Sequence, residues 1–208
     1  MEKGQGHSQA DGEKVSGLEA LISRARAEAG EKGLPPVEMW NPDFCGDIDM
    51  EIRADGTWFY MGTPIGRQPL VRLFSTILRK DEDGRTYLVT PVEKVDIRVE
   101  DAPFLAVEMS VTGEGATQAL TFRTNVGDVV EAGPEHPLRF EIAPENGGLK
   151  PYLRVRGRLE ALLARPVMYD LVALGEEMEI EGRLMFVVRS RGAVFTIMAA
   201  EGLKGDMV

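Results

Sequence analysis

The chain has 208 residues, of which 43% are hydrophobic and 28% are charged, and its formal net charge is −10. This length allows one large domain or two small ones, and the mixed composition excludes a wholly disordered chain. No apolar run approaches the roughly 18 residues of a membrane span, and the negative charge opposes binding to phosphate backbones, so we expect neither a membrane span nor a nucleic-acid partner.

The first fifteen residues are rich in Gly, Gln and charged side chains and show no apolar periodicity. They also lack the apolar stretch of a secretion signal, and Cys45, the single cysteine of the chain, cannot form an internal disulfide. We therefore expect a flexible tail over residues 1–15 and a cytoplasmic location.

Helical spacing of apolar residues occurs at three places after this tail. The first stretch predicts a helix over residues 17–29. A stripe from Leu70 to Leu78 predicts a second helix, which ends at the polar turn before Gly84. Residues 159–174 are expected to form a third helical stretch, either one helix or two short ones broken at Pro166.

Strand-like alternation fills most of the remaining chain. A hairpin turn at Asp55-Gly56 joins the first two expected strands. Short turns between the strands that follow indicate antiparallel sheets rather than βαβ crossovers. The expected strands span residues 47–53, 57–61, 87–89, 92–99, 104–111, 119–123, 129–131, 138–142, 152–155, 178–180, 184–188 and 194–198.

The order strand, helix, strand occurs twice along the chain. A shift of 98 residues aligns residues 65–90 with 163–188 without a gap and pairs Leu73 with Leu171. The identities alone are only modestly above chance, but the matched order of elements supports a remote internal duplication. The two leucines are then expected to be equivalent buried positions.

Residues with catalytic or metal-binding chemistry are sparse. The two histidines, His7 and His136, are too few for a His/Cys metal site, and the acidic turn at residues 81–84 lacks the flanking carboxylates of a calcium loop. Packing explains Cys45 better than catalysis does. We expect no metal or cofactor and a binding protein rather than an enzyme. An enzyme that acts through carboxylates, such as Glu93 or Asp101, is the alternative.

A Gly-rich turn over residues 62–67 leads into the second predicted helix. It is not a Walker loop, but Thr63 and Arg67 could hold one anionic group at a helix N-terminus, and an ordinary strand-to-helix turn is the alternative. Trp58 and Tyr60 precede this turn. They are either core residues or an aromatic platform for a ligand.

A basic row over residues 154–158 is the second candidate for an anion site. Arg154, Arg156 and Arg158 alternate with period 2 and are expected to share one face of a strand. Such guanidinium groups match phosphate or carboxylate, although salt bridges to the surplus acids explain them as well. We select Arg67 and Arg156 as anion donors, Arg154 and Arg123 as secondary donors and Tyr60 as the platform. The candidate ligand-binding residues are Arg67, Arg156, Arg154, Arg123, Tyr60 and Thr63.

Five short blocks of this sequence occur in the same order in a known family. They are Gly62-Thr63-Pro64-Ile65-x-Arg67, Leu88 to Lys94, Val99 to Phe104, Phe122-Arg123-Thr124-Asn125 and Pro151-Tyr152-x-x-Val155-Arg156. Over about residues 36–199 the chain thereby resembles the proteobacterial family catalogued as domain of unknown function 1285, which has no established activity. The resemblance implies a two-part fold with a duplicated core, a second part similar to pleckstrin-homology domains, a ligand site between the parts that takes a nucleotide-based molecule, and a role in signalling.

From the pattern and the resemblance we expect an α+β fold of two structurally related parts, mainly antiparallel sheets with one helix each plus an N-terminal helix. The first part is expected over residues 16–91 and the second over residues 92–208. We expect a cytoplasmic regulator in signal transduction that binds a small anionic ligand, such as a nucleotide, between its parts. An enzyme acting on a phosphorylated metabolite and a protein-interaction module with a protein partner are the alternatives.

Overall fold

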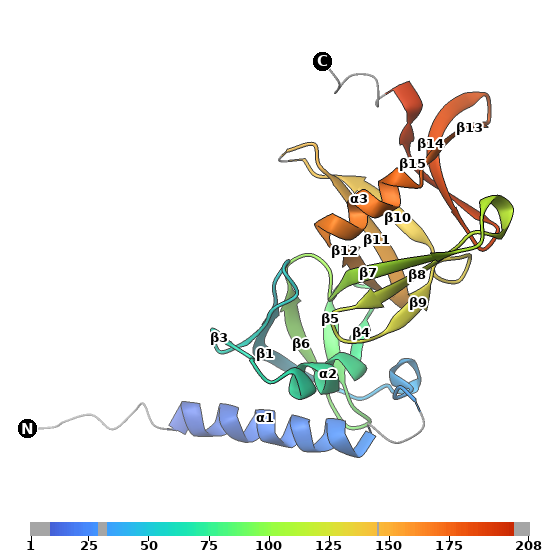
Figure 1. The fold of residues 1–208 in the computed structure, drawn as a ribbon. Helices are drawn as coiled ribbons and strands as arrows, with labels where there is room; N and C mark the ends of the chain where they lie inside the picture. The colour runs from blue at the N-terminus through green and yellow to red at the C-terminus, as the bar shows by residue number, and fades with distance from the viewer. Residues whose placement is uncertain (1–8, 29–32, 145, 202–208) are drawn as a thin grey trace, which may run out of the picture. The chain divides into compact units, whose positions relative to one another are not determined.

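The computed structural model describes residues 9–28, 33–144 and 146–201, which form three α-helices and fifteen β-strands (Figure 1). None of these helices combines the length and the apolar character needed to cross a membrane. Contacts within the chain divide it into two compact units. The first unit extends to Met50 and continues over Phe59–Arg98, and the second contains Glu51–Trp58 and the chain from Val99 onward.

Most of the first unit is a six-stranded sheet with the strand order β3-β2-β1-β6-β5-β4. Helices α1 (Gln9–Glu28) and α2 (Gln68–Thr76) contact each other in this unit, and a 3-10 turn, η1 (Val37–Met39), precedes the sheet. The strands are β1 (Phe44–Ile52), β2 (Trp58–Tyr60), β3 (Thr63–Pro64), β4 (Leu78–Lys80), β5 (Thr86–Val89) and β6 (Lys94–Val99).

Helix α1 begins at Gln9, inside the segment expected as a tail, while residues 1–8 of that segment lie outside the described residues. Its described part ends at Glu28, and residue 29, the predicted end, lies outside the described residues. Leu21 and Ala25 are buried, as expected for apolar residues one turn apart on one helix face. These two side chains therefore help to hold α1 to its unit.

Helix α2 follows the predicted apolar stripe, with Val71 and Phe74 buried. Pro69 lies in the first turn, where a missing N–H costs no helical hydrogen bond. The helix ends at Thr76, earlier than predicted, because Leu78 already belongs to β4 and pairs with Leu88 of β5. Both leucines are fully buried, so sheet pairing replaces the last helical turn.

The second unit contains a six-stranded sheet of order β10-β11-β12-β7-β8-β9 and a three-stranded sheet of order β13-β14-β15. Strands β12 and β7 pair in parallel. The elements are β7 (Phe104–Thr112), η2 (Gly115–Thr117), β8 (Ala119–Thr124), β9 (Val129–Glu131), β10 (Leu138–Ile142), β11 (Leu149–Arg156), β12 (Leu159–Leu163), α3 (Arg165–Ala173), β13 (Glu176–Ile180), β14 (Arg183–Ser190) and β15 (Ala193–Ala199). An α+β fold with two similar parts, as predicted, is confirmed.

The predicted helix at residues 159–174 is wrong in its first half. Residues 159–163 form β12, in which Leu159, Ala161 and Leu163 are buried and the residues between them are partly exposed. A period of two is typical of a strand, but over five residues it cannot be distinguished from the start of an apolar helix. Helix α3 begins at Arg165, with Pro166 in its first turn.

The hairpin at residues 51–58 is held within the second unit by Asn125. The side-chain amide of Asn125 donates to the Gly56 carbonyl at 3.4 Å, and its Oδ1 accepts from the Leu105 N–H at 3.0 Å. Gly56 has a φ of +79°, and a Cβ on it would lie 2.7 Å from Asn125 Nδ2. Only glycine fits this contact without strain. The contact therefore accounts both for the glycine of the hairpin and for Asn125, the last residue of the family block that begins at Phe122.

The two parts share a helix followed by an antiparallel hairpin. Helices α2 and α3 each have nine residues with proline second, and the hairpins β4–β5 and β13–β14 follow them. Pro69 and Pro166 are 97 residues apart, whereas the hairpin residues keep the shift of 98. The extra residue is Gly175, which stands between α3 and β13. Within the helices, Leu171 therefore corresponds to Phe74.

This correspondence corrects the predicted equivalence of Leu73 and Leu171. Leu73 is only half-buried, whereas Phe74 and Leu171 are both fully buried. The shift of 98 residues fits the hairpins, whereas the helices require a shift of 97, so the predicted helix pairing was displaced by one residue. The likeness of the second part to pleckstrin-homology domains stays a prediction.

Candidate functional site

A hollow of about 240 Å³ lies in the first unit between α1 and the sheet. Its apolar lining includes Leu21 of α1, Ile48 of β1, Val95 of β6 and Met61, which follows β2. Strand alternation and the apolar face of α1 bring these residues to one place. The hollow is slightly smaller than a typical drug-sized ligand pocket, so it suits a small molecule.

The most buried acidic group of the hollow is Glu93, which precedes β6 and is 15% exposed. Its Oε2 atom lies 2.6 Å from Nη1 of Arg24 on α1. Its Oε1 atom is buried and has no hydrogen-bond partner among the described residues. A buried carboxylate oxygen without a donor is costly, and the ion pair of the other oxygen with Arg24 offsets part of that cost.

The other polar residues that line the hollow are Asp47, Asp49, Tyr60 and Cys45. Burial, together with the Asp49 charge, raises the pKa of Tyr60, so its phenol is neutral at physiological pH. None of the described lining residues is Lys or Arg. The three carboxylates of the lining each pair with an arginine from outside it. These pairs are Glu93 with Arg24 at 2.6 Å, Asp47 with Arg85 at 3.6 Å and Asp49 with Arg98 at 3.0 Å.

Cys45 carries the single thiol of the chain, and its side chain is exposed at the hollow. Its Sγ donates a long hydrogen bond of 3.4 Å to the Asp43 carbonyl. A catalytic thiol is usually activated by a neighbouring histidine or by a cation that favours the thiolate, and the described lining residues include neither. The thiol is therefore useful as a chemical reporter of the hollow.

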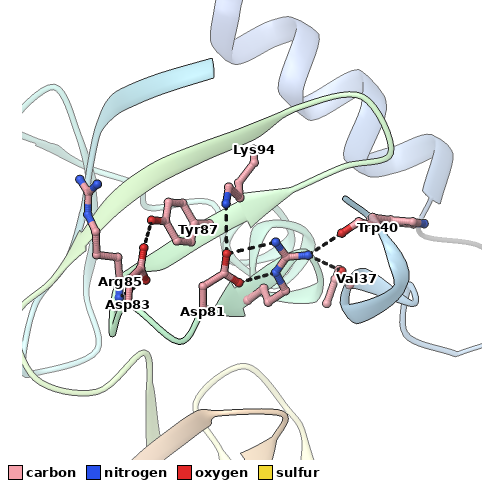
Figure 2. Close-up of polar contacts among 8 residues, drawn as sticks. Val37, Trp40, Asp81, Asp83, Arg85, Tyr87 and Lys94 are labelled. Carbon is pink, nitrogen blue, oxygen red and sulfur yellow. Dashed lines mark hydrogen bonds and ion pairs between the residues drawn. The ribbon is translucent and has the colours of Figure 1, made fainter. Parts of the chain in front are cut away.

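A separate polar network in the first unit is centred on Arg79, which is 7% exposed. Figure 2 shows its surroundings. The guanidinium donates to the Val37 carbonyl at 2.9 Å and the Trp40 carbonyl at 2.7 Å, and its Nε lies 2.6 Å from Asp81 Oδ1. Lys94 Nζ lies 3.1 Å from the other Asp81 oxygen. These contacts fasten the segment around η1 to the β4–β5 hairpin.

Two carboxylates of the acidic turn at residues 81–84, Asp81 and Asp83, are held by protein groups. Burial alone would raise the pKa of Asp81, but hydrogen bonds from Arg79 and Lys94 lower it overall. The Tyr87 hydroxyl donates to Asp83 at 2.6 Å, which, with burial, raises the pKa of Tyr87 to about 12 (Figure 2). In the described part of the chain, no group of three His, Cys, Asp or Glu is arranged to hold a metal ion.

Three of the predicted site residues lie in the first unit, and one of them lines the hollow. Tyr60 does so, whereas Trp58, its predicted companion, is fully buried in the core. Thr63 is exposed in β3. Arg67 is exposed at the start of α2, and its side chain forms no ion pair with another described residue.

The predicted arginine row of the second unit is broken. Strand β11 is irregular between Arg154 and Arg156, and Arg158 lies in the turn after it, so the three do not share one face as predicted. Arg156 lies 2.8 Å from Asp128 and packs over the Phe104 ring at 4.8 Å. The bulge aims this guanidinium at an acidic partner instead of at solvent.

The two secondary donors differ in their contacts. Arg154 is exposed, and its side chain forms no ion pair with another described residue. Arg123 donates to Glu108 at 2.7 Å beside a shallow hollow of about 190 Å³ on β7, β8 and β9. Two of the four predicted anion donors, Arg123 and Arg156, are therefore neutralised by carboxylates.

Asp101, the other carboxylate considered for catalysis, is part of a polar cluster in the second unit. Its Oδ1 accepts from the Tyr152 hydroxyl at 2.8 Å, and Lys150 forms an ion pair with its Oδ2. Burial and the hydrogen bond to Asp101 raise the pKa of Tyr152 to about 12. The guanidinium of Arg139 covers the Tyr152 ring at 4.2 Å. Both carboxylate oxygens of Asp101 therefore bind side chains of β11, namely those of Tyr152 and Lys150.

Sequence reasoning missed the hollow itself and the place of Glu93 in its lining. Glu93 lies in the block from Leu88 to Lys94, but its ion-pair partner is Arg24 on α1, which is distant in sequence. The apolar spacing of the first predicted helix indicates that Leu21 is buried, as it is, but does not indicate which part of the fold it packs against. The signal that could have found the site is the coincidence of this stripe with an acidic residue inside a family block.

Comparisons with known proteins agree with the two-part division. Residues 35–102 match the family model described as domain of unknown function (DUF1285), N-terminal domain, and residues 103–197 match protein of unknown function (DUF1285), C-terminal domain. No curated protein matches the chain.

Two solved structures are similar to this chain. A crystal structure of a DUF1285 family protein from Silicibacter pomeroyi DSS-3 is 52% identical, with a TM-score of 0.80, over 88% of this chain and 97% of that one. A DUF1285 family protein from Shewanella baltica OS155 is 29% identical, with a TM-score of 0.48, over 61% of this chain and 91% of that one. Along the chain, a boundary between the two units falls between Arg98 and Val99, close to the junction of the two family models.

Proposed function

The chain belongs to the DUF1285 family, a family of unknown function, and from this premise we propose that it is a regulatory protein that binds a small molecule without converting it. The observation that carries the proposal is the hollow beneath α1, with its apolar wall and the Tyr60 ring. A mostly apolar hollow with a few convergent polar groups is typical of small-molecule sites.

The non-catalytic part of the proposal is supported by how the candidate catalytic groups are engaged. Asp81, Asp83 and Asp101 accept hydrogen bonds from neighbouring side chains, and Glu93 forms an ion pair with Arg24. The described residues that line the hollow beside Cys45 include no histidine. A general acid or base must be free to exchange a proton with a substrate. These acids instead contribute to the stability of the fold.

The expectation of an anionic ligand, such as a nucleotide, stays a prediction. It rests on Arg67 and Arg154, whose guanidinium groups have no ion-pair partner in the described part of the chain. Neither residue lines the hollow. An anionic ligand would therefore bind outside the hollow and depend on one or both of these arginines.

The test is a ligand screen read by two measurements on the full chain. Each compound from a set of nucleotides, phosphorylated metabolites, amines and neutral aromatics is assayed for a rise in melting temperature and for slower alkylation of Cys45 by N-ethylmaleimide. A ligand at 100 times its dissociation constant stabilises a protein by about 2.7 kcal/mol. A ligand of the hollow raises the melting temperature and protects Cys45, which is the only thiol in the chain.

Other outcomes of the screen are equally informative. A compound that stabilises the protein without protecting Cys45 binds elsewhere, and loss of its effect in Arg67→Ala or Arg154→Ala would establish the anionic ligand. A compound that is consumed during incubation contradicts the non-catalytic proposal. If no compound in the set stabilises the protein or protects the thiol, the proposal of small-molecule binding is wrong.

A further inference from the structure

We propose that the hollow binds a small neutral molecule that is mostly apolar, and that Gly17 and Met61 shape it for that ligand. This inference rests on the proposed function, because it names the ligand class of the same hollow. Two observations carry it. Both residues line the hollow although each is unfavourable for the backbone that it occupies, and the carboxylates of the described lining already have arginine partners.

Gly17 leaves space on the helix side of the hollow. It lies inside α1, where glycine is less favourable than alanine because its backbone loses more conformational freedom on folding. A Cβ on Gly17 would have no described neighbour within 4 Å, so close packing does not require a glycine here. The missing side chain therefore costs helix stability, and what it provides is room for a ligand.

Met61 forms an apolar wall from a backbone conformation that suits other residues better. Its φ is +48°, in the left-handed region that disfavours bulky side chains, and with Gly62 it forms the turn between β2 and β3. The other described non-glycine residues with positive φ are Glu181 and Arg191, at the corresponding positions of the β13–β14 and β14–β15 turns. Both are charged, so the hollow is the place where this turn position carries an apolar side chain. Strained backbone of this kind is concentrated at functional sites.

The described lining offers no unpaired charge to a ligand. Glu93, Asp47 and Asp49 each pair with an arginine, and none of the described lining residues is Lys or Arg. A cationic ligand would compete with these arginines, and an anionic ligand would find no countercharge. Because moving a charge from water into a mostly apolar site without a partner is costly, the lining favours a neutral ligand.

The rest of the described lining fits a small ring. Leu21, Ile48 and Val95 add apolar surface, whose burial is favourable, and the Tyr60 ring can pack against an aromatic ligand. An apolar cavity of about 150 Å³ can hold benzene, so a hollow of about 240 Å³ has room for a substituted ring. 2-Phenylethanol is a neutral molecule of this kind and serves as the probe.

The experiment compares three probes of nearly equal shape on the full wild-type chain. 2-Phenylethanol is neutral, phenethylamine carries a positive charge and phenylacetate carries a negative one. Calorimetric titration and protection of Cys45 from N-ethylmaleimide are measured for each probe. We expect 2-phenylethanol to protect the thiol and to bind about tenfold or more tightly than either charged probe, because only the neutral probe enters without losing the hydration of a charge.

Gly17→Leu tests the space beside the helix. The leucine should fill the hollow, maintain or raise the melting temperature through its better helix propensity, and weaken 2-phenylethanol binding about tenfold or more. Glu19→Leu is the matched control, because it adds the same side chain at an exposed position of α1 outside the described lining. It should retain the affinity within about threefold. Wild-type affinity in Gly17→Leu would show that the probe binds elsewhere and would overturn the proposal.

Met61→Asn tests the wall independently. Asn-Gly is a preferred pair in turns of this kind, so the variant should be at least as stable as wild type while its affinity for 2-phenylethanol falls about fivefold or more. Glu181→Asn makes the same change at the corresponding turn of the second unit and should leave the affinity unchanged. Unchanged affinity in Met61→Asn, or a melting temperature clearly below that of Glu181→Asn, would make Met61 a packing residue and contradict its assignment to the ligand.

The wild-type probe series separates this inference from the proposed function. If a charged probe binds as tightly as 2-phenylethanol or more tightly and protects Cys45, the hollow is a small-molecule site but the neutral ligand class is wrong. If 2-phenylethanol neither binds nor protects the thiol, this inference is wrong, and the proposed function is then decided by the remaining compounds of the screen.

Discussion

The Nη1 atom of Arg24 lies 2.6 Å from the Oε2 atom of Glu93, so an ion pair joins helix α1 to the residue that precedes β6. The side chain of Arg24 is half-exposed, whereas that of Glu93 is mostly buried. Leu21 and Ala25 pack on the same side of the helix and are more buried than either charge. Apolar packing therefore holds α1 in place, and the ion pair adds to it.

Arg24→Gln should consequently lower the free energy of unfolding by less than about 1 kcal/mol, because a half-exposed ion pair contributes little in water. Urea denaturation measures this difference. Arg26→Gln is the matched control, since Arg26 is exposed on the same helix and forms no ion pair with a described residue. A loss above about 2 kcal/mol for Arg24→Gln alone would show that the ion pair, not the apolar face, fixes the helix.

The helices of the two parts give a second prediction. Leu171→Ala should cost about 2–5 kcal/mol and Phe74→Ala about 3–5 kcal/mol, because both side chains are fully buried. Leu73→Ala should cost clearly less, because Leu73 is half-buried. Chemical denaturation of the three variants tests the correspondence of Phe74 with Leu171. A larger loss for Leu73→Ala than for Phe74→Ala would instead support the equivalence of Leu73 with Leu171 that the shift of 98 residues predicts.

Sequence patterns were sufficient for the elements whose periodicity is local. Helix α2 and the hairpin at Asp55-Gly56 follow directly from apolar spacing and turn chemistry. Strand β12 was mistaken for a helix because alternation over five residues is too short to separate from a helical segment. Its identity is fixed by pairing with β7, which is distant in sequence.

The candidate site was only partly accessible to sequence reasoning for the same reason. Tyr60 was identified because it is an aromatic residue beside a Gly-rich turn, and it does line the hollow. Glu93 pairs with Arg24 of α1, a contact that no local pattern specifies. The bulge at β11 turned Arg156 toward Asp128, and a strict period of two could not anticipate it.

The Arg79 network predicts a pH-dependent stability. Hydrogen bonds from Arg79 and Lys94 lower the pKa of Asp81 below its ordinary value of 3.8. A lowered folded-state pKa means that the contribution of Asp81 is present above about pH 4 and is lost as the pH falls through the folded-state value. Asp81→Asn should therefore lose less stability than wild type when urea denaturation is repeated between pH 6 and pH 3. Identical pH profiles would contradict this role of Asp81.

Arg79 itself should be among the most sensitive positions of the first unit. Arg79→Met leaves Asp81 and the carbonyls of Val37 and Trp40 without their buried donor, and should cost on the order of 3 kcal/mol. Arg79→Lys keeps the charge but cannot reach all of these acceptors, so an intermediate loss is expected. Denaturation midpoints measure both. Stability equal to wild type in Arg79→Met would mean that the segment around η1 does not depend on this side chain.

The last prediction separates the two interpretations of Arg156. Its ion pair with Asp128 and its packing over Phe104 make it a structural residue, so Arg156→Ala should lower stability by about 1–3 kcal/mol. Arg154→Ala is the matched control on the same strand and should be neutral within about 0.5 kcal/mol, because its side chain is exposed. Asp128→Asn should reproduce part of the loss, since it removes the same ion pair from the other side. If Arg156→Ala instead keeps full stability while weakening an anionic compound found in the ligand screen, Arg156 is a binding residue, and its ion pair with Asp128 is one that the ligand displaces.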